Sequence, residues 1–256
     1  MMFNLNLYKN NLATDFIGQV IKYYRKIDST NTKAWELISK NTPNGTVIIS
    51  DNQLKGRGRQ SNKWISTPGK SLTFSIIMYP NYIPNQINLY SLFTGLAIID
   101  CLIENNIQAQ LKWPNDILIN VKKVGGILCE SKISGGVIKS LVIGIGLNVN
   151  ENITELPESL RKNTTSLMIE NGIQYQLEIL LANILNHLEH RIQNQDEIYS
   201  QILDWEKCCA HLGQKVTFHT GNEIVTGIFK GLTETGQAII TINNKEVNFD
   251  SGEIID

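Results

Sequence analysis

The segment from Gly56 to Trp64, GRGRQSNKW, carries residue types that are well suited to binding an anion. Its glycines, Gly56 and Gly58, let the backbone approach a ligand closely. Arg57 and Arg59 alternate with them, and each guanidinium is a planar fork that matches carboxylate or phosphate oxygens. The tryptophan offers a flat surface on which a purine could stack. From these residues alone, an anion site and a solvated hairpin tip remain alternatives.

Two further polar clusters follow strand-like runs. In KWPND, Pro114 fixes a turn that places Lys112, Asn115 and Asp116 at the end of a strand. In KKVGGIL, Lys123 stands ahead of a glycine pair, where a side chain or a ligand can pack directly on the backbone. An ordinary surface turn and an ordinary hairpin turn are the alternatives for these two clusters.

Other patterns that often mark function are incomplete. PGKS ends like a phosphate-binding loop, but Trp64 stands where the first glycine would be. GIGLNV has Val149 where a dinucleotide fingerprint has glycine or alanine. His187 and His190 have no evident third ligand, so we expect no metal site built by the protein. The four cysteines show no Cys-x-x-Cys spacing, which argues against zinc and against a disulfide framework.

The overall composition is that of a soluble globular protein. Of the 256 residues, 42% are hydrophobic and 18% are charged, and the formal net charge is -1. This charge provides no global basic field for nucleic acid, so any anion site must be local. The N-terminus does not read as a signal sequence, and no run reads as long enough to span a membrane. We therefore expect a cytoplasmic protein without a membrane partner.

Alternating strand and helix patterns predict an α+β fold with a mixed sheet. Strands are expected at 20–27, 45–52, 71–80, 109–113, within a hairpin at 116–132, and at 136–149, where one strand and a strand pair are both possible. Helices are expected at 28–40, 86–106, 175–193 and 197–212. After Gly213 the pattern changes to short alternating segments, which predict a small antiparallel barrel. The boundary between a main domain, 1–210, and this barrel, 211–256, is placed there.

Taken together and in order, several segments resemble the biotin protein ligases (biotin–[acetyl-CoA-carboxylase] ligases). The matching segments are DSTN (28–31), GRGRQSNKW (56–64), KWPND (112–116), KKVGGILCE (122–130), GIGLNVN (144–150) and DWEK (204–207). The resemblance covers nearly the whole chain from about residue 20. It implies a catalytic domain of the biotin/lipoate ligase type followed by an SH3-like barrel. It also implies that ATP adenylates biotin, and that a lysine of a carrier domain then attacks the biotinyl adenylate.

The resemblance also assigns roles to individual residues. Those expected at the biotin are Ser29, Thr30, Asn31, Gln53, Arg57, Gly58, Arg59, Lys123, Gly126, Gly144 and Gly146. Those expected at ATP or the adenylate, with its Mg²⁺, are Arg59, Trp64, Lys112, Asn115, Lys123 and Asn148. The catalytic set is expected to be Arg57, Arg59, Lys123 and Asp116, with Asp116 accepting the proton of the incoming lysine.

The resemblance implies a biotin carboxyl carrier domain of acetyl-CoA carboxylase, or of a related carboxylase, as the partner. The first strand begins about twenty residues into the chain, so we expect no N-terminal DNA-binding domain and no DNA partner. The protein is expected to be a monomer or a homodimer. Gln60 and Asn62 depart from the more basic arginine segment of the family, which puts nucleotide affinity or loop closure in doubt. A lipoate-type ligase and a non-catalytic carrier-binding or RNA-binding module are the alternatives.

Overall fold

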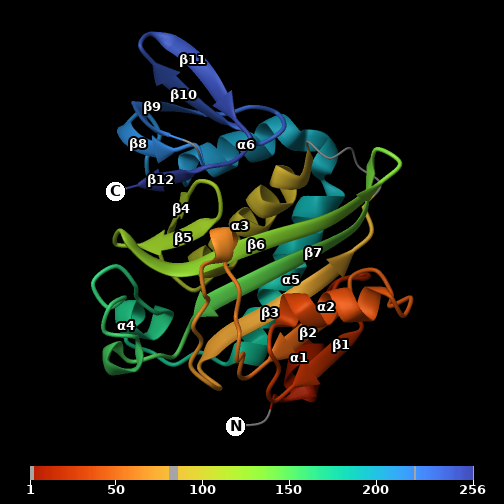
Figure 1. Ribbon diagram of the computed structural model, residues 1–256. Helices are drawn as coiled ribbons and strands as arrows, with labels where there is room; N and C mark the ends of the chain where they lie inside the picture. Colours follow the sequence, from red (N-terminus) through yellow and green to blue (C-terminus); the bar gives the residue numbers. More distant parts are fainter. Residues whose placement is uncertain (1–2, 81–85, 222, 256) are drawn as a thin grey trace.

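A seven-stranded mixed sheet forms the centre of the protein (Figure 1), as described for residues 3–80, 86–221 and 223–255 by a computed structural model. Its strands are β1 (Ile21–Tyr24), β2 (Val47–Ser50), β3 (Ser71–Met78), β4 (Gln110–Lys112), β5 (Asp116–Ile119), β6 (Lys122–Ser134) and β7 (Val137–Asn148). Their order is β1-β2-β3-β7-β6-β5-β4. β1 pairs with β2 in parallel and the remaining neighbours are antiparallel, so the predicted mixed sheet is confirmed. β7 is one continuous strand, which decides between the two possibilities for residues 136–149.

Helices cover both faces of this sheet (Figure 1). They are α1 (Leu5–Asn11), α2 (Thr30–Ile38), α3 (Ile87–Glu104), α4 (Leu167–Asn171), α5 (Leu177–Gln193) and α6 (Ile198–Lys207), with short 3-10 turns η1 (Arg59–Ser61), η3 (Ile153–Glu155) and η4 (Gln195–Glu197). α2 packs Ala34 and Leu37 on the sheet residues Ile48, Ile77 and Val142. α3 and α5 pack together in the main core on the other face.

α1 was not predicted from the sequence. Among its residues only Tyr8 is buried, so its seven residues carry almost no apolar periodicity.

α3 corrects the expectation that no run is long enough to span a membrane. By length and hydropathy this 18-residue helix qualifies, but 67% of it is buried inside the protein. Its apolar residues are covered by the sheet and by α5, which makes α3 the central helix of the core.

The C-terminal strands form a separate five-stranded sheet. They are β8 (Lys215–His219), β9 (Ile224–Leu232), β10 (Ala238–Ile242), β11 (Lys245–Phe249) and β12 (Glu253–Ile255), in the order β11-β10-β9-β8-β12. All these neighbours are antiparallel, as a small barrel requires, and the α+β class is confirmed. Trp113 connects the two sheets, because its indole donates to the Gly236 carbonyl at 3.2 Å and its ring lies 5.7 Å from that of Phe218. The domain boundary at 210/211 stays a prediction.

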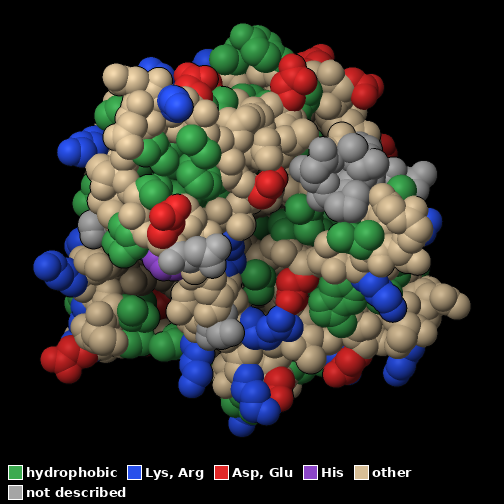
Figure 2. All heavy atoms as spheres, turned by 45° about the horizontal axis from the view of Figure 1, so that its top comes forward, with side chains coloured by type: hydrophobic (Ala, Val, Ile, Leu, Met, Phe, Trp, Pro, Cys, Tyr) green, Lys and Arg blue, Asp and Glu red, His purple; other side chains and the backbone are tan. Residues whose placement is uncertain are grey.

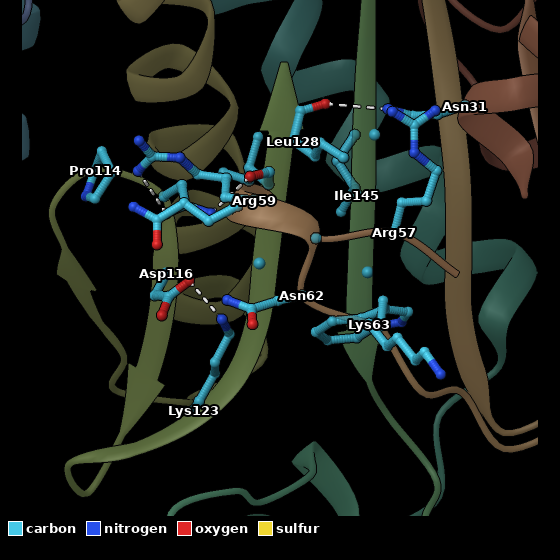
Figure 3. A pocket seen from close by; sticks show the side chains of 18 of the residues that line it. Asn31, Arg57, Arg59, Asn62, Lys63, Pro114, Asp116, Lys123, Leu128 and Ile145 are labelled. Carbon is cyan, nitrogen blue, oxygen red and sulfur yellow. Dashed lines mark hydrogen bonds and ion pairs between the residues drawn. The ribbon is translucent and has the colours of Figure 1, made fainter. Parts of the chain in front are cut away.

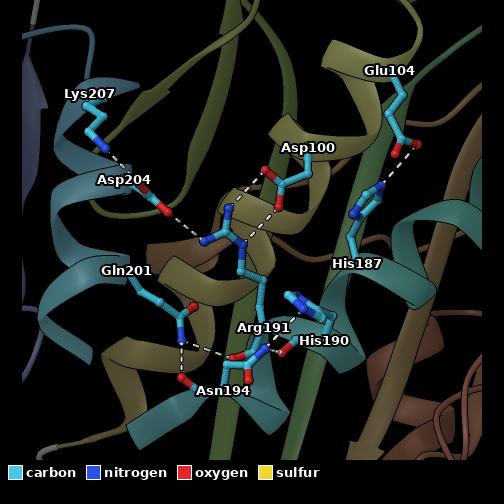
Figure 4. A network of polar contacts seen from close by, with 9 residues as sticks. All are labelled: Asp100, Glu104, His187, His190, Arg191, Asn194, Gln201, Asp204 and Lys207. Atoms are coloured by element: carbon cyan, nitrogen blue, oxygen red, sulfur yellow. Dashed lines mark hydrogen bonds and ion pairs between the residues drawn. The ribbon is translucent and has the colours of Figure 1, made fainter. Parts of the chain in front are cut away.

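A charged network ties α3, α5 and α6 together on the side of the sheet away from α2 (Figure 4). Arg191 of α5 donates two hydrogen bonds to Asp100 of α3, both at 2.9 Å, and one to Asp204 of α6 at 2.9 Å. Burial raises the pKa of Asp204, but hydrogen bonds from Arg191 and Lys207 outweigh it and hold that pKa below its ordinary value. The ionised network therefore stabilises the folded protein.

Arg191→Met is expected to destabilise the protein by about 2 kcal/mol, because the Arg191 side chain is only 17% exposed and its loss leaves two carboxylates without their partner. Lys207→Met removes an exposed partner of Asp204 and is the control, with an expected change within about 0.5 kcal/mol. Equilibrium urea unfolding of the three proteins measures both. The cost of Arg191→Met should be full above pH 3.8, the ordinary pKa of Asp204, and should shrink as the pH falls through the lower folded-state pKa. Equal costs for the two variants would contradict this assignment.

Candidate active site

A cavity lies on the α2 face of the large sheet, beneath the segment 54–64, which we call the arginine loop (Figure 3). The space inside it is about 880 Å³, a volume that includes its open mouth. Figure 2 shows one face of the molecule hollowed near its centre, with Lys or Arg and Asp or Glu side chains around the hollow. The cavity walls come from the arginine loop, the start of α2, the KWPND turn and the start of β12.

The floor of the cavity is rich in glycine, with the Leu128 side chain on the same face. β6 and β7 pair so that Gly126 lies opposite Gly146, and Gly144 lies opposite Leu128. A Cβ atom on Gly144 would lie 2.1 Å from Asn31 Oδ1, and one on Gly146 would lie 2.3 Å from the indole of Trp64. Glycine is therefore required at both positions, because the two wall residues lie directly on the strand.

A neutral polar cluster forms one end of the cavity. The backbone N–H of Thr30 donates to Gln53 Oε1 at 2.7 Å. Ser75 Oγ lies 2.7 Å from Thr30 Oγ1 and 2.6 Å from Asn31 Oδ1. The Ser29 side chain caps α2 by accepting from the backbone N–H of Thr32, which fixes where the helix starts. The hydrogen-bonding groups of this cluster are uncharged, and the Arg57–Glu130 ion pair lies beside them.

Basic groups form the other end. Arg59 Nη1 donates to Asn115 Oδ1 at 3.4 Å and to the Gly252 carbonyl at 3.3 Å. Burial lowers the pKa of Arg59, against the opposing effect of the Asp116 and Glu253 carboxylates. Lys123 Nζ lies 2.6 Å from Asp116 Oδ1. The poorly solvated guanidinium has only neutral direct acceptors, so an added anion would stabilise it.

Arg57 and Arg59 point to different ends of the cavity, although the sequence placed them together. Arg57 pairs with Glu130, which also accepts from Asn31. Figure 3 shows Arg57 on the Asn31 side and Arg59 beside Pro114. Gln60, which lies between the two arginines and Asn62 in the sequence, has a left-handed backbone conformation with φ 50° and ψ 37°. The chain reverses its direction there. The segment in which arginine alternates with glycine thus directs its two charges to different ends of the cavity.

The structure brings almost all predicted site residues to this one cavity. Those that line it are Ser29, Thr30, Asn31, Gln53, Arg57, Gly58, Arg59, Trp64, Lys112, Asn115, Asp116, Lys123, Gly126, Gly144 and Gly146. Asn148 is outside this lining: it is buried, and its amide donates to the Thr165 carbonyl at 3.0 Å. The roles of all these residues stay predictions.

Sequence reasoning missed several parts of the site. Ser75 reads as an ordinary position in the apolar run TFSII, and Glu130 was quoted only as the last letter of a motif. Gly252 and Glu253 line the cavity from the C-terminal sheet, and no spacing rule connects them to Arg59. Only the signal of a polar residue within a buried strand could have identified Ser75.

Neither the histidines nor the cysteines add a second kind of chemistry here. In the described ranges, no three His, Cys, Asp or Glu side chains converge as metal ligands would. His187 Nε2 lies 3.1 Å from a Glu104 carboxylate oxygen on the far side of the sheet. Cys129 is close to Arg59, but burial raises the pKa of its thiol to about 12, so it is a neutral thiol at physiological pH.

Comparisons with known proteins agree with the motifs. Residues 23–148 match the biotin/lipoate A/B protein ligase family, and residues 211–255 match the biotin protein ligase C-terminal domain. The bifunctional ligase/repressor BirA of Bacillus subtilis is 32% identical over 91% of this chain and 72% of its own length. The chain belongs to the biotin protein ligases. It is therefore an enzyme that attaches biotin to protein at the expense of ATP, and the predicted fold, an α+β catalytic domain with an SH3-like barrel, is confirmed.

Two further relatives are informative about this ligase. The biotin–[acetyl-CoA-carboxylase] ligase of Mycobacterium tuberculosis is 27% identical over 82% of this chain and 79% of its own length. The structure of the Aquifex aeolicus biotin protein ligase in complex with biotin and ATP has a TM-score of 0.80 at 30% identity, and covers 93% of this chain and 98% of that one.

The glycine floor makes a graded prediction for the ligase. Gly144→Ala should weaken biotin binding by about tenfold or more, because the new methyl group displaces Asn31 from its hydrogen bonds. Gly126→Ala should cost less than about threefold, because its methyl group would meet Lys123 Cε at 3.4 Å, an ordinary contact. Calorimetric titration with biotin measures both, and melting temperatures check that the variants fold. Similar losses of biotin affinity in the two variants would contradict the special role of the contact between Gly144 and Asn31.

Proposed function

We propose that the cavity holds biotin with its fused rings at the Asn31 end and Mg-ATP at the Arg59 end. Biotin is activated there as biotinyl-5'-AMP and then passed to a lysine of a biotin carboxyl carrier domain. The observation that carries this proposal is the arrangement of the polar groups along one glycine-rich floor, with the uncharged cluster of Thr30, Asn31 and Ser75 at one end and Arg59 with Lys123 at the other. A ureido ring needs neutral donors and acceptors, whereas a carboxylate and a triphosphate need cations.

The first step joins the two substrates. A biotin carboxylate oxygen attacks the α-phosphorus of ATP, the bond to the β-phosphate oxygen breaks, and pyrophosphate leaves. Both reactants are anionic, so the barrier contains charge repulsion that fixed cations can relieve. Arg59 and Lys123 are placed for this at the basic end, while Arg57 reaches the tail of biotin from the Asn31 end.

Two side chains are proposed at the nucleotide base and its phosphates. Trp64 lies flat against Gly146, and its indole Nε1 is buried without a hydrogen-bond partner among the described residues. This donor and the adjacent ring face suit the adenine. Lys112 lines the same end of the cavity, where it would approach the phosphates.

The second step transfers biotin to protein. The carrier lysine attacks the biotinyl carbonyl as a free amine, an amide bond forms, and AMP leaves with the bonding electrons. The ammonium form must first lose a proton, and Asp116, a carboxylate at this end of the cavity, is proposed to accept it. Its partner Lys123, 2.6 Å away, would have to turn toward the phosphate to free that carboxylate.

The other partners are proposed on weaker grounds. Mg²⁺ would enter as the counterion of the ATP phosphates. The similarity to the biotin–[acetyl-CoA-carboxylase] ligase of M. tuberculosis supports acetyl-CoA carboxylase as the carrier's parent enzyme. The name of the B. subtilis relative includes a repressor function, and DNA binding of this chain is not proposed. A cytoplasmic location and a monomeric or dimeric state remain predictions.

The decisive experiment incubates the protein with biotin, Mg-ATP and a carrier domain of acetyl-CoA carboxylase, and scores the mass of the carrier. We expect a gain equal to biotin minus water, which requires ATP and is lost when the acceptor lysine of the carrier is changed to Arg. Lipoate in a parallel reaction tests the related ligase activity. A gain with lipoate alone would replace the proposed substrate, and no gain with either acid would favour a non-catalytic module.

Arg59→Gly should uncouple the two steps. Because Arg59 holds the phosphate end, its loss should release biotinyl-5'-AMP to solution about tenfold faster while adenylate is still made. Rapid gel filtration of enzyme with labelled biotin and ATP measures the retained adenylate. Lys55→Gly is the matched control, since Lys55 is an exposed cation of the same loop that pairs with Asp28 outside the cavity. Equal retention by Arg59→Gly and the unchanged protein would refute this role.

A further inference from the structure

Glu130 lies just beyond the cavity floor on β6 and faces the same side of the sheet. Side chains alternate along a strand, so Gly126, Leu128 and Glu130 share one face. Two of these three line the cavity, and Glu130 continues the row toward α2. Its side chain is only 22% exposed, although it carries a full charge. A carboxylate in that position needs partners from the surrounding walls.

Its partners come from both walls of the Asn31 end. Arg57 of the arginine loop pairs with one carboxylate oxygen through Nη2. Asn31 Nδ2 donates to the other oxygen at 2.9 Å, and the Trp35 indole donates to that same oxygen at 3.4 Å. One carboxylate thus joins the arginine loop to α2 across the floor.

The same contact sets the direction of the Asn31 amide. With Nδ2 directed at Glu130 and at the Leu128 carbonyl, Oδ1 faces Ser75 and the backbone of Gly144. An amide has donors on one side and acceptors on the other, so a partner that accepts from Nδ2 decides which side faces the cavity. Glu130 therefore influences both the charge and the hydrogen-bonding pattern at this end.

The ion pair with Glu130 does not occupy all the N–H donors of the Arg57 guanidinium. The ion pair involves Nη2, while a guanidinium has five N–H donors, and 45% of the Arg57 side chain is exposed. Arg57 can hold Glu130 and still present N–H groups to a second anion. Arg59 differs, because its hydrogen-bond acceptors are a neutral amide and a neutral carbonyl.

From this geometry we propose that Glu130 is a positioning residue of the ligase. Through Arg57 and Asn31 it fixes the arginine loop over the floor before biotin binds, so that biotin does not have to order the loop. Preorganisation of this kind appears in affinity, not in the chemical step. The inference about biotin affinity rests on the proposed function, whereas the tether between Glu130 and the loop does not.

Glu130→Gln is the sharpest test, because glutamine keeps an oxygen for Asn31 and Trp35 but loses the ion pair with Arg57. We expect KM for biotin to rise about fivefold with kcat unchanged within about twofold, the size of one partly exposed ion pair. Glu36→Gln is the control, since it removes a comparable ion pair, with Lys33, on the outer side of α2. An unchanged or lower KM for biotin in Glu130→Gln would overturn the proposal. A lower KM would indicate that Glu130 competes with biotin for Arg57.

Limited trypsin digestion tests the tether between Glu130 and the arginine loop in the absence of any substrate. The arginine loop contains Lys55 and Lys63, and cleavage after them should be about fivefold faster in Glu130→Gln than in the unchanged protein or in Glu36→Gln. Saturating biotin should restore protection. If cleavage at these two sites is not faster, Glu130 does not hold the loop. Should the proposed function fail, biotin would protect neither protein, while the digestion without biotin would still decide the tether.

A double-mutant cycle separates action through Arg57 from general damage. Arg57→Gln should by itself speed cleavage after Lys55 and Lys63, and adding Glu130→Gln should change it by less than about twofold. A further full fivefold increase in the double variant would show that Glu130 acts by another route. Because Arg57→Gln alters only a loop side chain, this single variant still tests the tether if Glu130→Gln folds poorly: unchanged cleavage after Lys55 and Lys63 in Arg57→Gln would overturn it.

Discussion

The pairing of β6 with β7 at their glycines is the constraint on which the site depends. Gly126 opposite Gly146, with Gly144 two residues away, leaves a strip of sheet on which Leu128 is flanked by glycines. Asn31 and Trp64 can therefore lie on the backbone itself, at distances where a methyl group would not fit. The other walls then close around this strip, and a flat, elongated ligand can lie along it.

Charge is distributed along that strip with a clear polarity. The Asn31 end is held by hydrogen bonds among neutral side chains, with the single carboxylate of Glu130 facing the loop. At the Arg59 end, burial of the guanidinium lowers its pKa, which means that its charge is poorly solvated. A site of this kind favours an anion at the Arg59 end, where the guanidinium is poorly solvated, and an uncharged polar ring beside the neutral cluster at the Asn31 end.

The two faces of the sheet have different roles, since one face holds the main core and the other holds the candidate active site. On one face, α3 and α5 bury the main core, and the ion pairs of Arg191 connect α3, α5 and α6. On the other face, α2 and the arginine loop cover the strands and enclose the cavity. Strands that are packed firmly on the core face can hold polar groups at fixed distances on the cavity face.

The sequence alone determined the periodic elements and the membership of the family. The apolar spacing of α3 and α5 and the alternation in the C-terminal strands are local signals, and both predictions are confirmed. The motifs around Arg57, Pro114 and Lys123 are local as well, and they carried the family resemblance, which is confirmed, whereas the roles of their residues stay predictions. Only the tertiary structure decided that Arg57 and Arg59 diverge, that Ser75 and Glu130 join the site, and that Arg59 meets Gly252, 193 positions away. The physical reason is that spacing along the chain records what one element buries, whereas the partner of a polar side chain depends on which distant backbone the fold brings beside it.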